Sequence, residues 1–112
     1  MATLPLPHYV RIYPQTLDSL RADILSSAES YVAVDTETTG LRWMEDRAFG
    51  VSLAWDNKAT FIRNTDFGVS NIGTFLVDLF KADYKTFVFH NCEFDLHMIR
   101  ETYGALPPKN VL

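Results

Sequence analysis

The run Tyr31-Val32-Ala33-Val34-Asp35 constrains the fold more than any other part of the sequence. It is short, apolar and rich in β-branched residues, a composition that favours a β-strand. An apolar run without polar alternation is typical of a strand that is buried on both faces of its sheet. We therefore expect Tyr31 to Asp35 to be an interior strand of an α/β domain.

Apolar patterns elsewhere predict further strands and helices around this run. Compact or alternating segments indicate strands, and apolar residues three and four apart indicate helices. Thr16 and Asn91 are residue types that cap helices, and Thr38-Thr39-Gly40 ends the first apolar strand. The expected strands are His8 to Tyr13, Phe49 to Trp55, Thr60 to Arg63 and Thr86 to Phe89, with a turn at Asp56-Asn57-Lys58 between the second and the third of them. The expected helices are 17–27, 71–81 and 92–103, and Gly104 ends the last one. This order predicts a mixed sheet flanked by helices.

The composition is that of one soluble domain, formed by residues 1–112. Hydrophobic residues make up 47% and charged residues 21%, an ordinary globular balance. The net charge of −4 argues against nucleic-acid binding through a general surplus of basic residues. Cys92 alone cannot form an intrachain disulfide, and neither a secretory signal nor a membrane-spanning stretch is visible. We therefore expect a soluble cytoplasmic protein without a membrane partner.

Asp35 and Glu37 are the first candidates for chemistry. Residues two apart on a strand point to the same face, so these carboxylates project side by side. Two ionised carboxylates that close repel each other unless a cation or a proton lies between them. Hard divalent cations meet that need through oxygen ligands. The alternative is a solvated strand end, but the apolar strand before the pair and Thr-Thr-Gly-Leu after it favour a metal site.

A second cluster, His90-Asn91-Cys92-Glu93-Phe94-Asp95, lies where an expected strand meets an expected helix. Asp95 falls on the border of the apolar stripe of that helix, and a carboxylate beside a core needs a partner. We therefore interpret Asp95 as a metal ligand and Glu93 as a solvated acid of the first helical turn. Asn91 suits the helix cap, a role compatible with substrate contact. Cys92 is interpreted as a small core residue.

Together these segments resemble the DEDD-type 3′–5′ exonucleases of the ribonuclease H-like superfamily. Val32 to Leu41 is similar to the first motif of that family, and Asn91 with Asp95 matches the N-x₃-D form of the second. The resemblance is closest to the proofreading domains of bacterial and bacteriophage family A DNA polymerases. It implies a ribonuclease H-like fold and hydrolysis of the terminal phosphodiester of DNA.

The same resemblance implies roles for individual residues. Asp35, Glu37 and Asp95 would hold two Mg²⁺ or Mn²⁺ ions, which act by the two-metal mechanism. Thr38 and Asn91 would contact the terminal nucleotide, and Leu41 would be an apolar wedge against the last bases. The residues alone allow Leu41 equally well as core. The implied partner is a single-stranded or frayed DNA 3′ end, in a bacterial or phage-infected cell.

The sequence departs from the family pattern after Asp95. The third motif, Tyr-x₃-Asp or His-x₄-Asp, is not found, and Glu101 is the only later acid. We therefore expect a C-terminally incomplete domain, either a fragment, a split-gene product or a remnant, with part of its sheet uncovered. A polymerase domain or a separate chain would supply the third motif. Two alternatives remain open, an RNA-processing exonuclease of the same superfamily and a non-catalytic remnant that binds nucleic acid or a partner.

Overall fold

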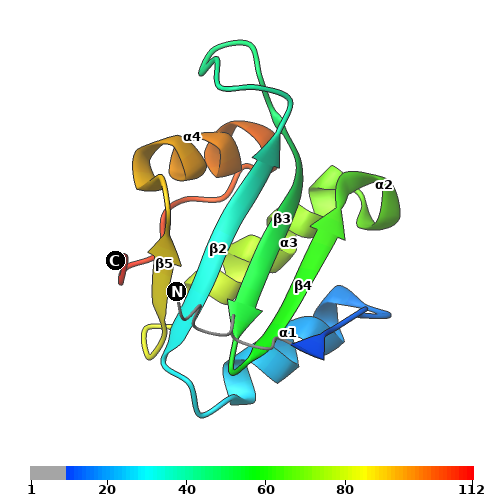
Figure 1. Cartoon of the computed structure of the whole chain (residues 1–112), viewed down its shortest axis with the longest axis vertical. Helices are drawn as coiled ribbons and strands as arrows, with labels where there is room; N and C mark the ends of the chain where they lie inside the picture. Colours follow the sequence, from blue (N-terminus) through cyan, green and yellow to red (C-terminus); the bar gives the residue numbers. More distant parts are fainter. Residues whose placement is uncertain (1–9) are drawn as a thin grey trace, which may run out of the picture.

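A computed structural model describes residues 10–112 of the chain (Figure 1). The strands are β1 (Val10–Arg11), β2 (Tyr31–Thr38), β3 (Ala48–Trp55), β4 (Lys58–Arg63) and β5 (Thr86–Phe89). The helices are α1 (Leu17–Ser26), α2 (Asn64–Phe67), α3 (Val69–Phe80) and α4 (Cys92–Tyr103). The predicted α/β class is confirmed.

The strands form one mixed sheet in the order β1-β4-β3-β2-β5. The β2–β3 and β3–β4 pairs are antiparallel, whereas β1–β4 and β2–β5 are parallel. The β3–β4 turn places Asp56 and Asn57 at φ of 46° and 59°, and both residue types tolerate the left-handed region that a two-residue hairpin requires. The predicted turn at this point is therefore confirmed.

The helices α1, α3 and α4 lie on the same side of the sheet, behind the strands in the view of Figure 1. Strand β2 shows the consequence, because its even residues, such as Val32 and Val34, are buried on the helix side. Its odd residues Tyr31, Ala33 and Asp35 are exposed. The prediction of a strand buried on both faces is therefore wrong. We call the side that carries the odd residues the open face of the sheet.

The core fills the space between the sheet and the helices. Its larger fully buried side chains include Phe75 and Leu76 from α3, Phe87 from β5 and Ile99 from α4. Burial of such side chains is the main favourable contribution to folding, at about 1.5–3 kcal/mol each. This core fixes the positions of β2, β5 and α4, which carry the candidate site.

Helix boundaries follow the predicted signals with two exceptions. Thr16 caps α1 by accepting a hydrogen bond from the Ser19 backbone N–H at 3.0 Å, and Gly104 ends α4 at φ 74°, a conformation that glycine adopts without strain. The short helix α2 was not predicted, and α3 begins at Val69 rather than near Asn71. The part of the expected first strand at residues 8–9 lies outside the described residues.

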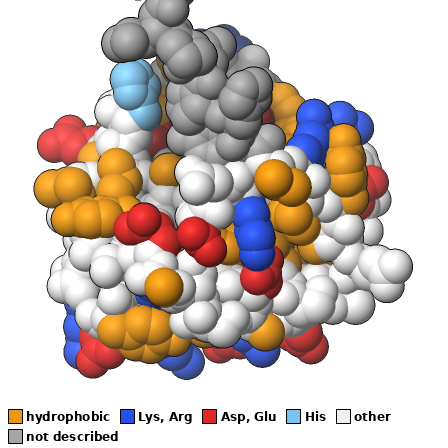
Figure 2. Space-filling model, turned by 60° about the horizontal axis from the view of Figure 1, so that its bottom comes forward, with side chains coloured by type: hydrophobic (Ala, Val, Ile, Leu, Met, Phe, Trp, Pro, Cys, Tyr) orange, Lys and Arg blue, Asp and Glu red, His pale blue; other side chains and the backbone are white. Residues whose placement is uncertain are grey.

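No helix in the described part of the chain is long and apolar enough to cross a membrane. On the side drawn in Figure 2, acidic, basic and hydrophobic side chains are interspersed. That distribution agrees with the slightly acidic net charge of −4. A substrate anion therefore needs local recognition rather than attraction by the protein as a whole.

Candidate active site

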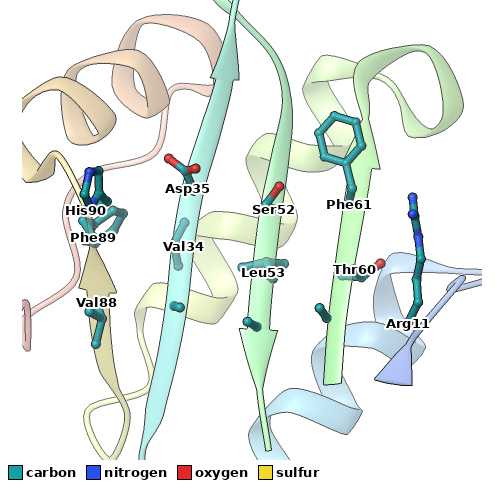
Figure 3. A pocket seen from close by; sticks show the side chains of 13 residues that line it. Arg11, Val34, Asp35, Ser52, Leu53, Thr60, Phe61, Val88, Phe89 and His90 are labelled. Atoms are coloured by element: carbon teal, nitrogen blue, oxygen red, sulfur yellow. The ribbon is translucent and has the colours of Figure 1, made fainter. Parts of the chain in front are cut away.

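The two motif segments meet because β2 and β5 are parallel neighbours. Their pairing runs from Tyr31 opposite Thr86 to Val34 opposite Phe89, so both strands end at the same edge of the sheet. Asp35 is the residue of β2 directly after this paired stretch, and His90 follows directly on β5 before α4 begins. Figure 3 shows Asp35 between His90 on one side and Ser52 of β3 on the other. Parallel pairing thus brings together residues that lie far apart in the sequence.

Asp95 is the most deeply buried acid of this site, with 2% of its surface exposed. Its Oδ1 accepts a hydrogen bond from the Thr36 hydroxyl at 2.6 Å and a longer one from the Thr36 backbone N–H at 3.4 Å. Its Oδ2 is buried without a hydrogen-bond partner among the described residues. A buried carboxylate oxygen without a partner is costly. One lone-pair region of Asp95 is therefore available to a cation or a substrate group.

Asp35 lies on the open face, and the charge of Asp95 affects its pKa. Partial burial raises the pKa of the Asp35 carboxyl above its ordinary value of 3.8, and the nearby Asp95 charge raises it further. The Thr36 backbone N–H and His90 act in the opposite direction. Two acids that disfavour each other's ionisation form an arrangement that a positive ion relieves.

A cavity of about 770 Å³ extends over the open face beside Asp35. The described residues around it include Asp35, Ser52, Phe61 and His90 (Figure 3). Polar groups thus lie at one end of a surface that Ala33, Ala54 and Val88 make largely apolar. Such a combination suits a ligand with a charged part and a flat apolar part.

Only part of the predicted set of metal ligands lies close together in the structure. No three His, Cys, Asp or Glu side chains within residues 10–112 stand close enough together to hold a metal ion. Asp35 and Asp95 influence each other electrostatically, but Glu37 does not complete a group of three with them. The partnerless Oδ2 of Asp95 and the raised pKa of Asp35 nevertheless fit a hard divalent cation. The assignment of Asp35, Glu37 and Asp95 as ligands stays a prediction.

The predicted substrate contacts lie around the same edge. Thr38 ends β2, and its hydroxyl donates to the Gly40 carbonyl at 2.8 Å. Leu41 is 77% exposed, which rules out the interpretation of Leu41 as core. Asn91 occupies the N-cap position of α4, but its side chain makes no capping hydrogen bond. The expected side-chain cap at Asn91 is therefore wrong, while a substrate contact there stays a prediction.

The remaining residues of the second cluster have simpler positions. Glu93 is exposed in the first turn of α4, as expected for a solvated acid. Cys92 is partly buried against the core, which agrees with its interpretation as a small core residue. His97 donates a hydrogen bond from Nε2 to the Trp43 carbonyl, at 2.7 Å. His97 therefore ties α4 to the loop that follows β2.

Asp46, in the loop between β2 and β3, was not singled out from the sequence. It is only 5% exposed and bonds to the segment that contains Thr38 and Leu41. The sequence shows it within the charged stretch from Arg42 to Arg47, which is typical of a solvated loop. The one signal in the sequence is Gly40, six residues before Asp46, because a glycine in a loop can indicate that another side chain packs against its backbone.

Comparisons with known proteins agree with these features. The model of a family described as 3′–5′ exonuclease matches residues 13–111. The DNA polymerase DpoZ of Acinetobacter phage SH-Ab 15497 is 43% identical over 84 residues, which cover 70% of this chain and 12% of the phage protein. DpoZ of Salmonella phage PMBT28 is 36% identical over 81 residues, covering 64% of this chain and 11% of the phage protein. The chain thus spans about an eighth of the length of these curated relatives.

Solved structures show the same architecture. Brucella melitensis NrnC with bound Mg²⁺ has a TM-score of 0.62 and 27% identity, with 94% of this chain and 48% of NrnC covered. Escherichia coli RNase D, described as an exoribonuclease involved in structured RNA processing, has a TM-score of 0.70 and 21% identity. That match covers 93% of this chain and 26% of RNase D, and at this identity it shows the fold alone.

Proposed function

Since this chain belongs to the 3′–5′ exonuclease family, we propose that it removes nucleotides from the 3′ end of DNA with the aid of two divalent cations. The observation that carries the proposal is the proximity of Asp35 to Asp95, whose second carboxylate oxygen is buried without a partner within residues 10–112. Both features favour positive charge between the two acids.

The similarity to two phage DNA polymerases supports DNA as the substrate. On the same basis we propose that a polymerase domain accompanies this domain, in the same chain or as a separate one, within a bacterial or phage-infected cell. Glu101 is exposed on α4 and is the only acid after Asp95. The fourth carboxylate of the site would therefore come from outside these 112 residues.

Asp35, Glu37 and Asp95 would hold the Mg²⁺ or Mn²⁺ ions. When bound, such ions lower the pKa of an attacking water and stabilise charge on a leaving oxygen. The protein's own part is to orient the carboxylates and the terminal nucleotide. Thr36 does this for Asp95, because its hydroxyl fixes Oδ1 and leaves Oδ2 without a hydrogen bond from the described residues.

Thr38, Leu41 and Asn91 would hold the terminal nucleotide. The support for Leu41 is its exposure next to the site, since an apolar side chain that water surrounds gains from contact with a base. The support for Asn91 is its uncommitted amide at the start of α4, close in sequence to Asp95. The apolar part of the cavity over the open face offers room for a base and its sugar.

The experiment is a single-turnover assay with protein in excess over a 5′-labelled single-stranded DNA, in Mg²⁺ or Mn²⁺. We expect slow stepwise shortening from the 3′ end, because one carboxylate of the site is supplied from elsewhere. Asp35→Ala should abolish shortening, and Glu93→Ala, which removes an exposed acid of α4, should leave it intact. Shortening that persists in Asp35→Ala, or that is absent in both metals even when a chain supplying the missing carboxylate is added, would contradict the proposal.

One observation favours RNA as a second candidate substrate. The structure of Brucella melitensis NrnC bound to pGG covers 94% of this chain at 27% identity. A matched RNA strand in the same assay separates the two candidates. Equal or faster shortening of RNA would replace the DNA proposal with an RNA-processing one.

A further inference from the structure

The carboxylate of Asp46 is buried in the loop that joins β2 to β3. It is 5% exposed although it lies in a stretch of charged residues. Its Oδ2 accepts a hydrogen bond from the Arg42 backbone N–H at 2.8 Å, and its Oδ1 accepts one from the Thr39 hydroxyl at 3.0 Å. Asp46 thereby joins both sides of the segment that contains Gly40 and Leu41.

Gly40 leaves the space that this contact needs. A Cβ built on Gly40 would lie 2.4 Å from Oδ2 of Asp46, closer than van der Waals contact permits. The carboxylate therefore lies directly against the Gly40 backbone. Any larger residue at position 40 would push Asp46 away from the Arg42 N–H.

Backbone hydrogen bonds close the same loop at its base. The Thr39 N–H donates to the Arg47 carbonyl at 3.2 Å, and the Asp46 N–H donates to the Arg42 carbonyl at 2.8 Å. The Arg42 backbone N–H and the Thr39 hydroxyl lower the pKa of the Asp46 carboxyl. The loop is thus held by an ionised acceptor, which makes stronger hydrogen bonds than a neutral one.

The loop is also fixed against α4, the helix that carries Asp95. The Trp43 ring packs edge-on against Phe94, with ring centroids 5.5 Å apart. It also lies beside His97, at 4.9 Å between ring centroids, while the Trp43 carbonyl bonds to the His97 ring. The loop therefore has contacts on both sides of Asp95 in the sequence, at Phe94 and His97.

We infer that Asp46 is a positioning residue of the nuclease site, whose carboxylate fixes the segment from Thr38 to Leu41 before substrate binds. The inference rests on the proposed function, because Thr38 and Leu41 are its candidate contacts to the terminal nucleotide. Leu41 is 77% exposed, and an exposed side chain on an unfixed loop would lose conformational freedom on binding. Fixing the loop beforehand removes most of that cost.

The geometry also indicates how each substitution affects the loop. Asp46→Ala removes both acceptors and frees the loop. Asp46→Asn keeps one oxygen for the Arg42 N–H and places its NH₂ near the Thr39 hydroxyl, which can accept as well as donate. Glu45 is the matched control, since it is an exposed acid of the same loop, paired with Arg42 at its surface.

The test measures KM and kcat for shortening of single-stranded DNA in Mn²⁺, together with the rate of tryptic cleavage at Arg42. We expect Asp46→Ala to raise KM about tenfold, because the freed loop must then be ordered when substrate binds, with kcat changed less than about twofold. Tryptic cleavage should accelerate by a similar factor. The KM of Asp46→Asn should remain within about threefold of that of the unaltered chain. The KM of Glu45→Ala should equal that of the unaltered chain.

Thr39→Val removes one of the two hydrogen bonds to Asp46 and serves where Asp46→Ala proves too unstable to fold. A KM in these variants equal to that of Glu45→Ala, or a fall in kcat with KM unchanged, would overturn the inference. In either case, shortening that still depends on Asp35 leaves the proposed function standing. Shortening that persists in Asp35→Ala would instead overturn the proposed function and this inference together.

Discussion

The hydrogen bond from the Thr36 hydroxyl to Asp95 permits a quantitative prediction. The bond is 2.6 Å long, and Thr36 and Asp95 are 8% and 2% exposed. Thr36→Val keeps the shape and the strand propensity of the side chain but removes the only hydroxyl that contacts Oδ1 among the described residues. The Thr36 backbone N–H, at 3.4 Å, remains as a weak donor. Asp95 would then have two poorly satisfied oxygens in a buried position.

Leaving a buried charged group without its hydrogen bond costs about 2 kcal/mol. A chain of this size has a urea m-value of about 1.5 kcal/mol/M, so the unfolding midpoint should fall by about 1.3 M. The assay is urea unfolding at pH 7 in EDTA, followed by far-ultraviolet circular dichroism. Because Oδ1 is also no longer oriented, nuclease activity should fall in the same variant.

The matched control is Thr74→Val. The Thr74 hydroxyl donates to the Ser70 carbonyl at 3.2 Å on the exposed side of α3, so its loss should change the unfolding free energy by less than about 0.5 kcal/mol. Equal midpoints for Thr36→Val and Thr74→Val would refute the reasoning, because Asp95 would then not depend on the Thr36 hydroxyl.

Three further outcomes are expected. Asp95→Asn should be at least as stable as the unaltered chain in EDTA, as shown by its thermal midpoint, because it removes a buried charge whose Oδ2 has no partner in the described part of the chain. Nuclease activity should nevertheless be lost. The raised pKa of Asp35 means that this residue's contribution to stability is present below pH 4 and is lost as pH rises through the raised pKa. Urea midpoints in EDTA should therefore favour Asp35→Asn increasingly between pH 4 and pH 7, and a constant difference would contradict this. Burial raises the pKa of Tyr103 to about 12, although its hydroxyl donates to Asn64 Oδ1, so absorbance at 295 nm should show a late titration that is missing from Tyr103→Phe. The stability that Tyr103 contributes should be lost between about pH 10 and pH 12.

The sequence predicted the elements that have strong local signals. The strand Thr86–Phe89 and the turn at Asp56-Asn57 are in the expected places, because β-branched and aromatic runs and left-handed turn residues are local properties. The helix ending at Gly104 was predicted for the same reason. Short α2 lacks such a signal, since four residues cannot show helical periodicity.

The error at β2 has a different origin. Tyr31 and Ala33 count as apolar in a sequence pattern, so the strand showed no alternation before Asp35. In the structure their side chains lie on the open face, where Tyr31 is 53% exposed. An apolar run indicates only that its side chains can be buried without cost. Which face is covered depends on where distant helices pack, and the run does not specify that.

The sequence analysis named the acids of the candidate site but not the residue that holds the neighbouring loop. The family resemblance placed Asp35 and Asp95 in one site, and the parallel pairing of β2 with β5 explains in the structure how the two segments meet. Asp46 was missed because its burial depends on how a loop closes around Gly40, and a charged residue between charged neighbours resembles surface. Asn91 was placed correctly at the start of α4, but capping by its side chain depends on a rotamer that residue type does not determine.

The position of β2 between β3 and β5 determines when during synthesis the site can form. Strands β2, β3 and β4 pair through short connections and are complete at Arg63. The β2–β5 pair joins Tyr31 to Thr86 and must close a long loop, which is slower and entropically costlier. Asp95 follows later still. At about 5–20 residues per second, a nascent chain therefore carries Asp35 for several seconds before Asp95 is made, so translation itself delays the meeting of the two acids.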